Sequence, residues 1–105
     1  MKSNQRNLQH RYEGEFVDGK REGKGCLIYC NGDYYDGEWM NNFFHGHGLF
    51  TTHHFTMAVL PHRGQRYEGM YEFGLKHGRG RLHAGDGSIY DGHFADNMRA
   101  YTFNS

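Results

Sequence analysis

The sequence predicts an all-β protein, an elongated single-layer antiparallel sheet made of stacked β-hairpin repeats in an open meander. A five-residue phrase that begins with tyrosine occurs four times, at Tyr12, Tyr35, Tyr67 and Tyr90. The first three copies are each followed, eleven residues after the tyrosine, by Gly-x-Gly. Residues typical of tight turns separate the apolar segments. Together these observations predict one β-hairpin per repeat.

The spacing of the repeats predicts the domain organisation. Successive tyrosines are 23 residues apart in the first and last intervals and 32 apart in the middle one. The tyrosine-to-glycine distance is unchanged in the middle unit, so we place an insertion after Gly48, at about residues 53–62. Residues 1–11 are predicted to be an N-terminal tail or cap, and residues 12–103 the repeat array. The last unit has Tyr101 where Gly-x-Gly is expected and is predicted to be incomplete.

Within each phrase an aromatic residue, a glycine and a second aromatic residue occupy alternate positions, which is the pattern of a strand with one buried face. The alternation resumes after Gly-x-Gly and places Leu27, Phe50 and Leu82 at equivalent positions. The predicted structural core consists of Tyr12, Phe16, Leu27, Tyr35, Trp39, Phe50, Tyr67, Tyr71, Leu82, Tyr90 and Phe94.

The turns are predicted from residues that tolerate a positive φ angle. Within units these are residues 18–20, 41–42 and 73–75, and between units residues 31–32 and 86–87. Glycine normally weakens a strand, so its recurrence at the centre of each phrase indicates an aromatic ring lying across the bare backbone.

The segments 12–25 and 67–80 resemble MORN repeats (membrane occupation and recognition nexus), and the resemblance extends from about Tyr12 to Phe103. It implies the hairpin-repeat fold and a small stand-alone member of the family. It also implies a non-catalytic protein-interaction or scaffold module, because no catalytic domain accompanies the repeats. By analogy with family members, we expect a ciliary, flagellar or sperm-associated assembly.

Composition limits the classes of partner and the cellular locations to be expected. The 105 residues carry 12 basic and 12 acidic side chains, so no net charge favours nucleic acid as a partner. The polar N-terminal segment lacks a secretory signal, and no apolar run approaches a membrane span, so we expect an intracellular, cytoplasmic or cytoskeletal protein. Cys26 and Cys30 lie about 13 Å apart on one predicted strand and are expected to be free thiols.

No catalytic, cofactor or metal site is predicted. A nucleophilic triad needs a nucleophile, a base and an orienting group in hydrogen-bond reach, and no such set is indicated. The nine histidines lack the spacing of zinc ligands, and His45 and His77 occupy the repeat position just before Gly-x-Gly. The glycines precede strands rather than a phosphate-binding helix.

Two departures from the repeat pattern predict a protein-binding surface. The middle hairpin has Phe43 and Phe44 near its tip, and the insertion adds four further apolar residues. Clustered exposed apolar side chains indicate a contact surface. The candidate partner-binding residues are Phe43, Phe44, Phe55, Met57, Val59 and Leu60. The alternative is that the insertion folds its apolar residues back on the sheet.

Basic hairpins provide the alternative function, peripheral binding of anionic phospholipid. The candidate lipid-contacting residues are Lys20, Arg21, Lys24, Lys76, Arg79 and Arg81. Because these residues share a repeat phase, we expect them on the same edge of the array, where each could contribute about 1 kcal/mol toward an anionic surface. The alternative interpretation is solubilising charge on exposed turns.

An open sheet also has unpaired edges. The incomplete last unit predicts an edge near Tyr101–Phe103 at which strand addition could form a homodimer. The same incompleteness leaves open that the chain is a fragment or an alternative isoform.

Overall fold

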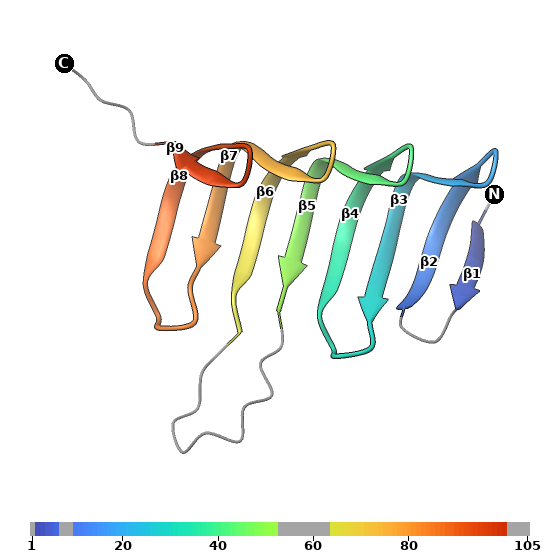
Figure 1. Cartoon of the computed structure of the whole chain (residues 1–105), viewed down its shortest axis with the longest axis horizontal. Helices are drawn as coiled ribbons and strands as arrows, with labels where there is room; N and C mark the ends of the chain where they lie inside the picture. Colours follow the sequence, from blue (N-terminus) through green and yellow to red (C-terminus); the bar gives the residue numbers. More distant parts are fainter. Residues whose placement is uncertain (1, 7–9, 53–63, 101–105) are drawn as a thin grey trace.

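The structure is a computed structural model, and it describes residues 2–6, 10–52 and 64–100. These residues form nine strands (Figure 1). The strands are β1 (Lys2–Arg6), β2 (His10–Val17), β3 (Lys20–Tyr29), β4 (Tyr34–Met40), β5 (Phe43–Thr51), β6 (Arg66–Glu72), β7 (Leu75–His83), β8 (Ile89–Ala95) and β9 (Met98–Ala100).

All nine strands belong to one sheet, in which each strand pairs antiparallel with the next one in sequence. The molecule is a single layer with a shortest dimension of 14 Å. In Figure 1 the strands follow one another from β1 at the right to β9 at the left, with the hairpin turns within units along the upper side. The predicted open meander of hairpins is confirmed.

Pairing inside the units follows the repeat. Unit one contains β2 and β3, unit two β4 and β5, unit three β6 and β7, and unit four β8 and β9. In each complete unit the leading tyrosine pairs with one of the three residues predicted to be equivalent: Tyr12 with Leu27, Tyr35 with Phe50 and Tyr67 with Leu82. These pairs put both residues on the same face of the sheet.

The tight turns have the backbone angles that their residues favour. Asp18 and Gly19 have φ of 51° and 77°, and Asn41 and Asn42 have 48° and 71°. Two successive positive φ values produce the hairpin turn whose twist matches the flanking strands. Phe73–Gly74 and Asp96–Asn97 repeat this geometry, and Gly32 and Gly87 have positive φ between the units.

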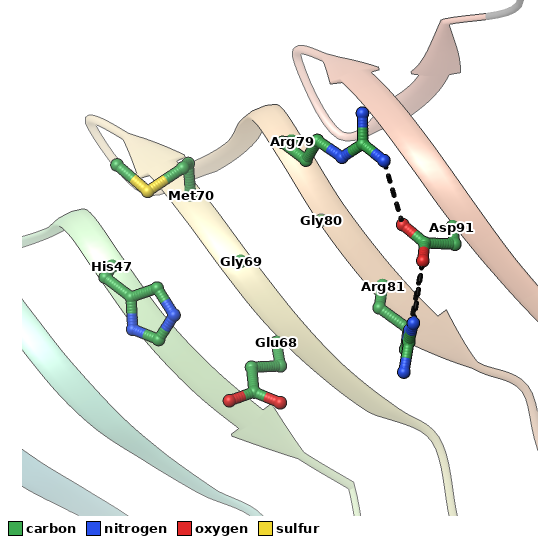
Figure 2. A pocket seen from close by; sticks show the side chains of 8 residues that line it. All are labelled: His47, Glu68, Gly69, Met70, Arg79, Gly80, Arg81 and Asp91. Atoms are coloured by element: carbon green, nitrogen blue, oxygen red, sulfur yellow. Dashed lines mark hydrogen bonds and ion pairs between the residues drawn. The ribbon is translucent and has the colours of Figure 1, made fainter.

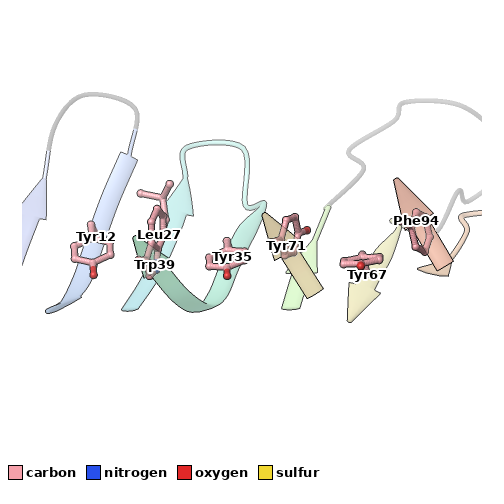
Figure 3. Close-up of a cluster of buried hydrophobic side chains, with 7 residues drawn as sticks. All are labelled: Tyr12, Leu27, Tyr35, Trp39, Tyr67, Tyr71 and Phe94. Atoms are coloured by element: carbon pink, nitrogen blue, oxygen red, sulfur yellow. The ribbon is translucent and has the colours of Figure 1, made fainter. Parts of the chain in front are cut away.

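The core is a row of aromatic rings on one face (Figure 3). Its seven buried members are Tyr12, Leu27, Tyr35, Trp39, Tyr67, Tyr71 and Phe94, and Phe16, Phe50, Leu82 and Tyr90 pack against them. Rings meet edge to face, as between Tyr35 and Trp39 at 5.1 Å and between Tyr67 and Phe94 at 5.0 Å. Such pairs each contribute about 0.5–1.5 kcal/mol beyond burial.

Each leading tyrosine lies across strand-paired glycines. A methyl group at Gly48 would collide with the ring of Tyr35, and a methyl group at Gly80 would collide with that of Tyr67. The tyrosine hydroxyl then donates to the carbonyl three residues onward, as from Tyr35 to Glu38 at 2.7 Å. Bare backbone is therefore required where the rings lie, as the recurrence of glycine indicates.

The ends of the array differ from its middle. The segment predicted as an N-terminal tail or cap contains β1, which pairs with β2 over five residue pairs. At the other end β9 pairs with β8 over three pairs, compared with six between β7 and β8. The predicted insertion at 53–62 and the edge at Tyr101–Phe103 lie outside the described residues.

Candidate functional site

The alternation of side chains gives the sheet two chemically different faces. The aromatic face carries the core rings. The polar face carries the residues between them: for example Glu13, Asp36, Glu68 and Asp91 each follow a leading tyrosine directly. All four acids lie in one cross-strand row with Arg81. The two faces must be considered separately as binding surfaces.

On the aromatic face, the residue nine positions after each leading tyrosine covers a tyrosine ring. In unit two Phe44 stacks on Tyr35, with ring centroids 3.8 Å apart and planes 6° apart. In the other units a cationic side chain takes this place. Measured from Cζ of arginine or Nζ of lysine to the ring centroid, Arg21 lies 5.8 Å from Tyr12, Lys76 5.4 Å from Tyr67 and Arg99 5.1 Å from Tyr90. We call these four residues the ring covers; the shared nine-residue offset was the available signal for them.

The ring covers shield the tyrosines from water. Burial raises the pKa of Tyr67 to about 12, against a small opposing effect of its hydrogen bond to the Met70 carbonyl. Burial also raises the pKa of Tyr35 and of Tyr71 well above the ordinary tyrosine value. The same burial lowers the pKa of Lys76. All four groups are thus held more firmly in their neutral forms.

A pocket of about 210 Å³ opens on the aromatic face near the hairpin turns of units one to three. Its apolar walls are Leu27, Tyr29, Trp39, Phe43 and Phe44, and Arg21, Asn42 and Gly74 complete it. The Nε atom of Arg21 is buried and has no hydrogen-bond partner among the described residues. We call this the hairpin-tip pocket.

The backbone around the pocket is fixed by links between neighbouring turns. The amide of Arg21 donates to the Asn42 side chain at 2.8 Å, and the amide of Asn42 returns a bond to the Arg21 carbonyl at 3.1 Å. Between units two and three, Gly74 stands where the turns of units two and four have asparagine, and the amide of Phe73 donates to Nδ1 of His45 at 3.2 Å. The tips therefore form one connected rim.

The predicted partner-binding residues have different positions. Phe44 is half-buried against Tyr35, so it contributes to the core as well as to the pocket wall. Phe43 is 48% exposed and meets Phe73, which is 52% exposed, at a ring distance of 6.1 Å. Phe55, Met57, Val59 and Leu60 lie outside the described residues.

The predicted lipid-contacting residues belong to hairpins whose turns lie along one side of the array, but their side chains are divided between the two faces. Arg21 and Lys76 lie over rings on the aromatic face, whereas Arg79 and Arg81 pair with Asp91 on the polar face at 3.9 and 2.8 Å. Lys20 is exposed at a turn, and Lys24 is exposed further along the same strand. This division follows because neighbouring residues of a strand point to opposite faces.

The polar face contains a recurring contact at the point where strand register shifts. In unit one the carboxylate of Glu15 accepts the backbone amide of Lys24 at 2.7 Å, and in unit two the carboxylate of Glu38 accepts that of His47 at the same distance. The first glycine of Gly-x-Gly lies beneath the carboxylate in both units, with φ of 67° at Gly23 and 87° at Gly46. We call each such place a carboxylate notch.

In unit three the polar face has a pocket of about 390 Å³ (Figure 2). It is lined by His47, Glu68, Gly69, Met70, Arg79, Gly80, Arg81 and Asp91. The Asp91 carboxylate lies between the two arginines, and the hydrogen bond and pairing with Arg81 hold the pKa of Asp91 below its ordinary value. Met70 occupies the repeat position of Glu15 and Glu38.

The described part of the chain has no cluster suited to a metal ion. There, no three His, Cys, Asp or Glu side chains are placed to hold a metal ion. Cys26 and Cys30 are free thiols, and burial raises the pKa of Cys26. Residues 2–6, 10–52 and 64–100 contain no helix of the length and apolarity that crossing a membrane requires.

A one-layer sheet with an aromatic face, a charged face and shallow pockets belongs to the class of repeat proteins that offer surfaces rather than reaction centres. The MORN repeat family model matches residues 12–34, 35–52 and 67–89. The chain belongs to the MORN repeat family. MORN repeats are generally non-catalytic modules that interact with proteins or membranes.

The chain is also similar to alsin from several mammals. It is 31% identical over 88 residues to alsin of Homo sapiens and of Pan troglodytes, and 30% identical to that of Rattus norvegicus. Each match covers 84% of this chain and 5% of the relative. The chain thus corresponds to a small part of these relatives.

Proposed function

We propose that this chain is a protein-binding scaffold module whose recognition surface is the hairpin-tip pocket. The observation that carries the proposal is the combination of an apolar wall containing Trp39, Phe43 and Phe44 with a buried polar group, Nε of Arg21, that has no hydrogen-bond partner among the described residues. Protein interfaces typically combine aromatic anchors at the centre with a polar rim.

The pocket specifies the kind of segment that would fit. Its apolar walls suit a medium-sized apolar side chain of the partner. A backbone carbonyl or carboxylate beside that side chain could accept the hydrogen bond that Arg21 Nε does not make within the described residues. Because the walls come from three consecutive units, an intact array is needed to form the site.

The best test compares two exposed residues at the same repeat position. Phe43 and Met98 both follow their leading tyrosine by eight residues, and both are exposed. Phe43→Ser alters the pocket, whereas Met98→Ser alters an equivalent place far from it. A photo-crosslinking amino acid at either position, used in lysate of ciliated tissue, identifies proteins in contact by mass spectrometry.

We expect one protein to crosslink at position 43 but not at 98, and its purified form to lose affinity for the Phe43→Ser variant but not for Met98→Ser. Equal binding to both variants would show that the pocket is not the site. A variant lacking residues 54–62 tests the proposed contribution of Phe55, Met57, Val59 and Leu60. Capture from ciliary or sperm structures would support the proposed setting.

Binding to anionic phospholipid is the alternative function, and the salt dependence of vesicle binding tests it. Flotation with phosphoinositide vesicles should weaken at high salt if surface charge drives it, because the Debye length falls from about 10 Å at 0.1 M to about 3 Å at 1 M. The division of the basic residues between two faces disfavours this function. Salt-sensitive flotation without protein capture would replace the scaffold proposal.

Self-association through the C-terminal sheet edge is a separate proposal. Among the described residues β9 pairs with Ala95, Phe94 and His93, a shorter ladder than that between β7 and β8. A second copy could add strands there. A mass measured by light scattering that stays monomeric at high protein concentration would rule this out.

A further inference from the structure

The carboxylate notch is filled from within the chain in units one and two. There a glutamate three residues after the leading tyrosine reaches across to the second strand. Its carboxylate accepts an amide at 2.7 Å and lies over a glycine whose φ is positive. Acceptance by a charged group makes this bond about twice as strong as a neutral one.

Unit three has the same backbone but a different side chain. Gly78 has φ of 85°, close to the 87° of Gly46, and the strand register shifts between Gly69 and Tyr71 as it does between Gly37 and Trp39. Met70 stands in the place of the glutamate. Methionine brings no carboxylate, so the bond that caps Lys24 and His47 has no counterpart at the Arg79 amide.

The space around this notch is open and charged. The polar-face pocket of about 390 Å³ reaches from Met70 to Asp91, and in Figure 2 the Met70 side chain turns away from Arg79 and Asp91. Arg79 and Arg81 share the one carboxylate of Asp91, and their side chains are 70% and 57% exposed. Both guanidinium groups therefore keep donors that can face solvent or a ligand.

Arginine donors, rather than a net charge, favour an incoming anion. The pocket is lined by two arginines, Arg79 and Arg81, and by two carboxylates, those of Glu68 and Asp91, so its charges balance while the guanidinium groups remain exposed. Around the filled notches of units one and two, by contrast, Glu15 and Glu38 themselves supply the negative charge. Of the three complete units, the third combines an uncapped notch with neighbouring arginines.

We propose that the carboxylate notch of unit three is a binding site for the side-chain carboxylate of an acidic residue on a partner protein. The incoming carboxylate takes the position that Glu15 and Glu38 occupy in their units, accepts the Arg79 amide, and pairs with the exposed guanidinium groups. A carboxylate rather than a phosphate is assigned because the filled notches hold carboxylates over the same backbone. The site is on the polar face and does not depend on the hairpin-tip pocket.

The test uses backbone amide signals, because the chain contains its own controls. Amide nitrogen–proton correlation spectra are recorded while the full chain is titrated with the peptide acetyl-Ala-Glu-Ala-amide, and in parallel with acetyl-Ala-Gln-Ala-amide. We expect a saturable downfield shift of the Arg79 amide with the glutamate peptide and none with the glutamine peptide. The amides of Lys24 and His47, which are already capped, should not respond.

Two variants test the assignment from opposite directions. Met70→Glu should move the Arg79 amide to the capped position without ligand and abolish its response to the peptide. Glu38→Met should open the notch of unit two and make the His47 amide responsive. Met70→Leu is the matched control, since it changes the side chain without supplying a carboxylate and should preserve the response. The dispersion of the same spectra shows that each variant is folded.

Several results would overturn the proposal. An Arg79 amide that does not respond to the glutamate peptide, or equal responses of Lys24 and Arg79, would show that the notch is not a specific site. Retained response in Met70→Glu would place the carboxylate elsewhere. Tighter binding of inorganic phosphate than of the glutamate peptide would overturn the assignment to a carboxylate. None of these outcomes depends on whether a partner uses the hairpin-tip pocket.

Discussion

On the aromatic face every unit places a tyrosine at the same position, whereas on the polar face the residue three positions later is Glu15, Glu38, Met70 or His93. The difference follows from the contacts. Each core ring packs against a ring of a neighbouring unit, so a change in one unit affects the next. The ring centroids of Tyr35 and Tyr71, for example, are 5.4 Å apart. The side chains of the polar face contact a neighbouring strand and solvent, which leaves them free to differ.

The aromatic face therefore determines folding, whereas the polar face carries much of the sequence difference between the units. The hairpin-tip pocket is an exception, because its walls include core residues such as Trp39 and Phe44. Substitutions and conditions that act on the aromatic face should reduce stability strongly. Those that act on the polar face should have small effects on stability and larger effects on binding.

Alkaline pH should have the largest effect, because it acts on several buried tyrosines at once. The pKa of Tyr67 is raised by burial from its ordinary value of 10.0 to about 12, and burial also raises that of Tyr35 and Tyr71. Between these values the unfolded chain has lost a proton that the folded chain retains, so stability falls as pH rises. The stabilisation that depends on neutral buried tyrosines should be fully present below about pH 10.

The measurement follows tyrosinate absorbance and circular dichroism together from pH 9 to pH 13. We expect unfolding to accompany tyrosine ionisation in one transition. Tyr67→Phe removes one of the titrating groups and should make the loss of stability with pH shallower. If all tyrosines ionised near their ordinary pKa without loss of the β-sheet signal, the core tyrosines of the aromatic face would not be buried.

Trp39→Ala should be the most destabilising single substitution. Trp39 is buried, meets the rings of Tyr12 and Tyr35, and donates from Nε1 to the Gly25 carbonyl at 2.9 Å. Truncation of a core tryptophan costs about 3–5 kcal/mol, which is a large part of the stability of a small domain. Urea unfolding measures the loss. Asp36→Ala, on the polar face of the same strand, should change the unfolding free energy by less than about 0.5 kcal/mol.

The sequence predicted the aromatic face well because that face obeys a simple period. Alternation placed Tyr12 and Leu27 in the core, and the strand glycines indicated a ring across the backbone. The ring contacts of Arg21 were not predicted. Its guanidinium carbon lies 4.9 Å from the centroid of the Trp39 ring, a contact across strands that no local pattern shows.

The polar face was less predictable for a different reason. The role of Glu38 depends on a register shift between Gly37 and Trp39, which leaves the His47 amide opposite a side chain. A strict period of two contains no such shift. The notch could have been suspected from the paired recurrence of glutamate and Gly-x-Gly in units one and two, and from its absence at Met70.

A matched pair of glycines sharpens the comparison between the middle of the array and its end. Added methyl groups at Gly69 and Gly92 occupy the same repeat position. At Gly69 the methyl would approach backbone, with Cα of Gly80 at 2.5 Å and the Arg79 carbonyl at 2.6 Å. At Gly92 the three nearest atoms all belong to the side chain of Tyr90, with Oη at 2.7 Å, so no backbone atom opposes the methyl as closely.

Gly69→Ala should therefore destabilise by about 1–3 kcal/mol, the usual cost of overpacking, and Gly92→Ala by clearly less. Thermal unfolding of the two variants beside the unmodified chain provides the measurement. Equal losses would mean that the last unit is as tightly packed as the interior units. A larger loss of stability for Gly92→Ala would mean that the last unit is packed more tightly than the interior units.

The smallest expected effects test whether the polar face contributes to stability through its notches. Glu38→Met removes the acceptor of the His47 amide and should cost about 0.5–1.5 kcal/mol, the usual net value of a hydrogen bond open to water. Met70→Glu should gain a similar amount by capping Arg79. Glu38→Gln retains an acceptor without charge and should fall between. If urea unfolding gives the same free energy for all three variants, the carboxylate notch does not contribute to stability. Its role would then be limited to binding, which the peptide titration measures separately.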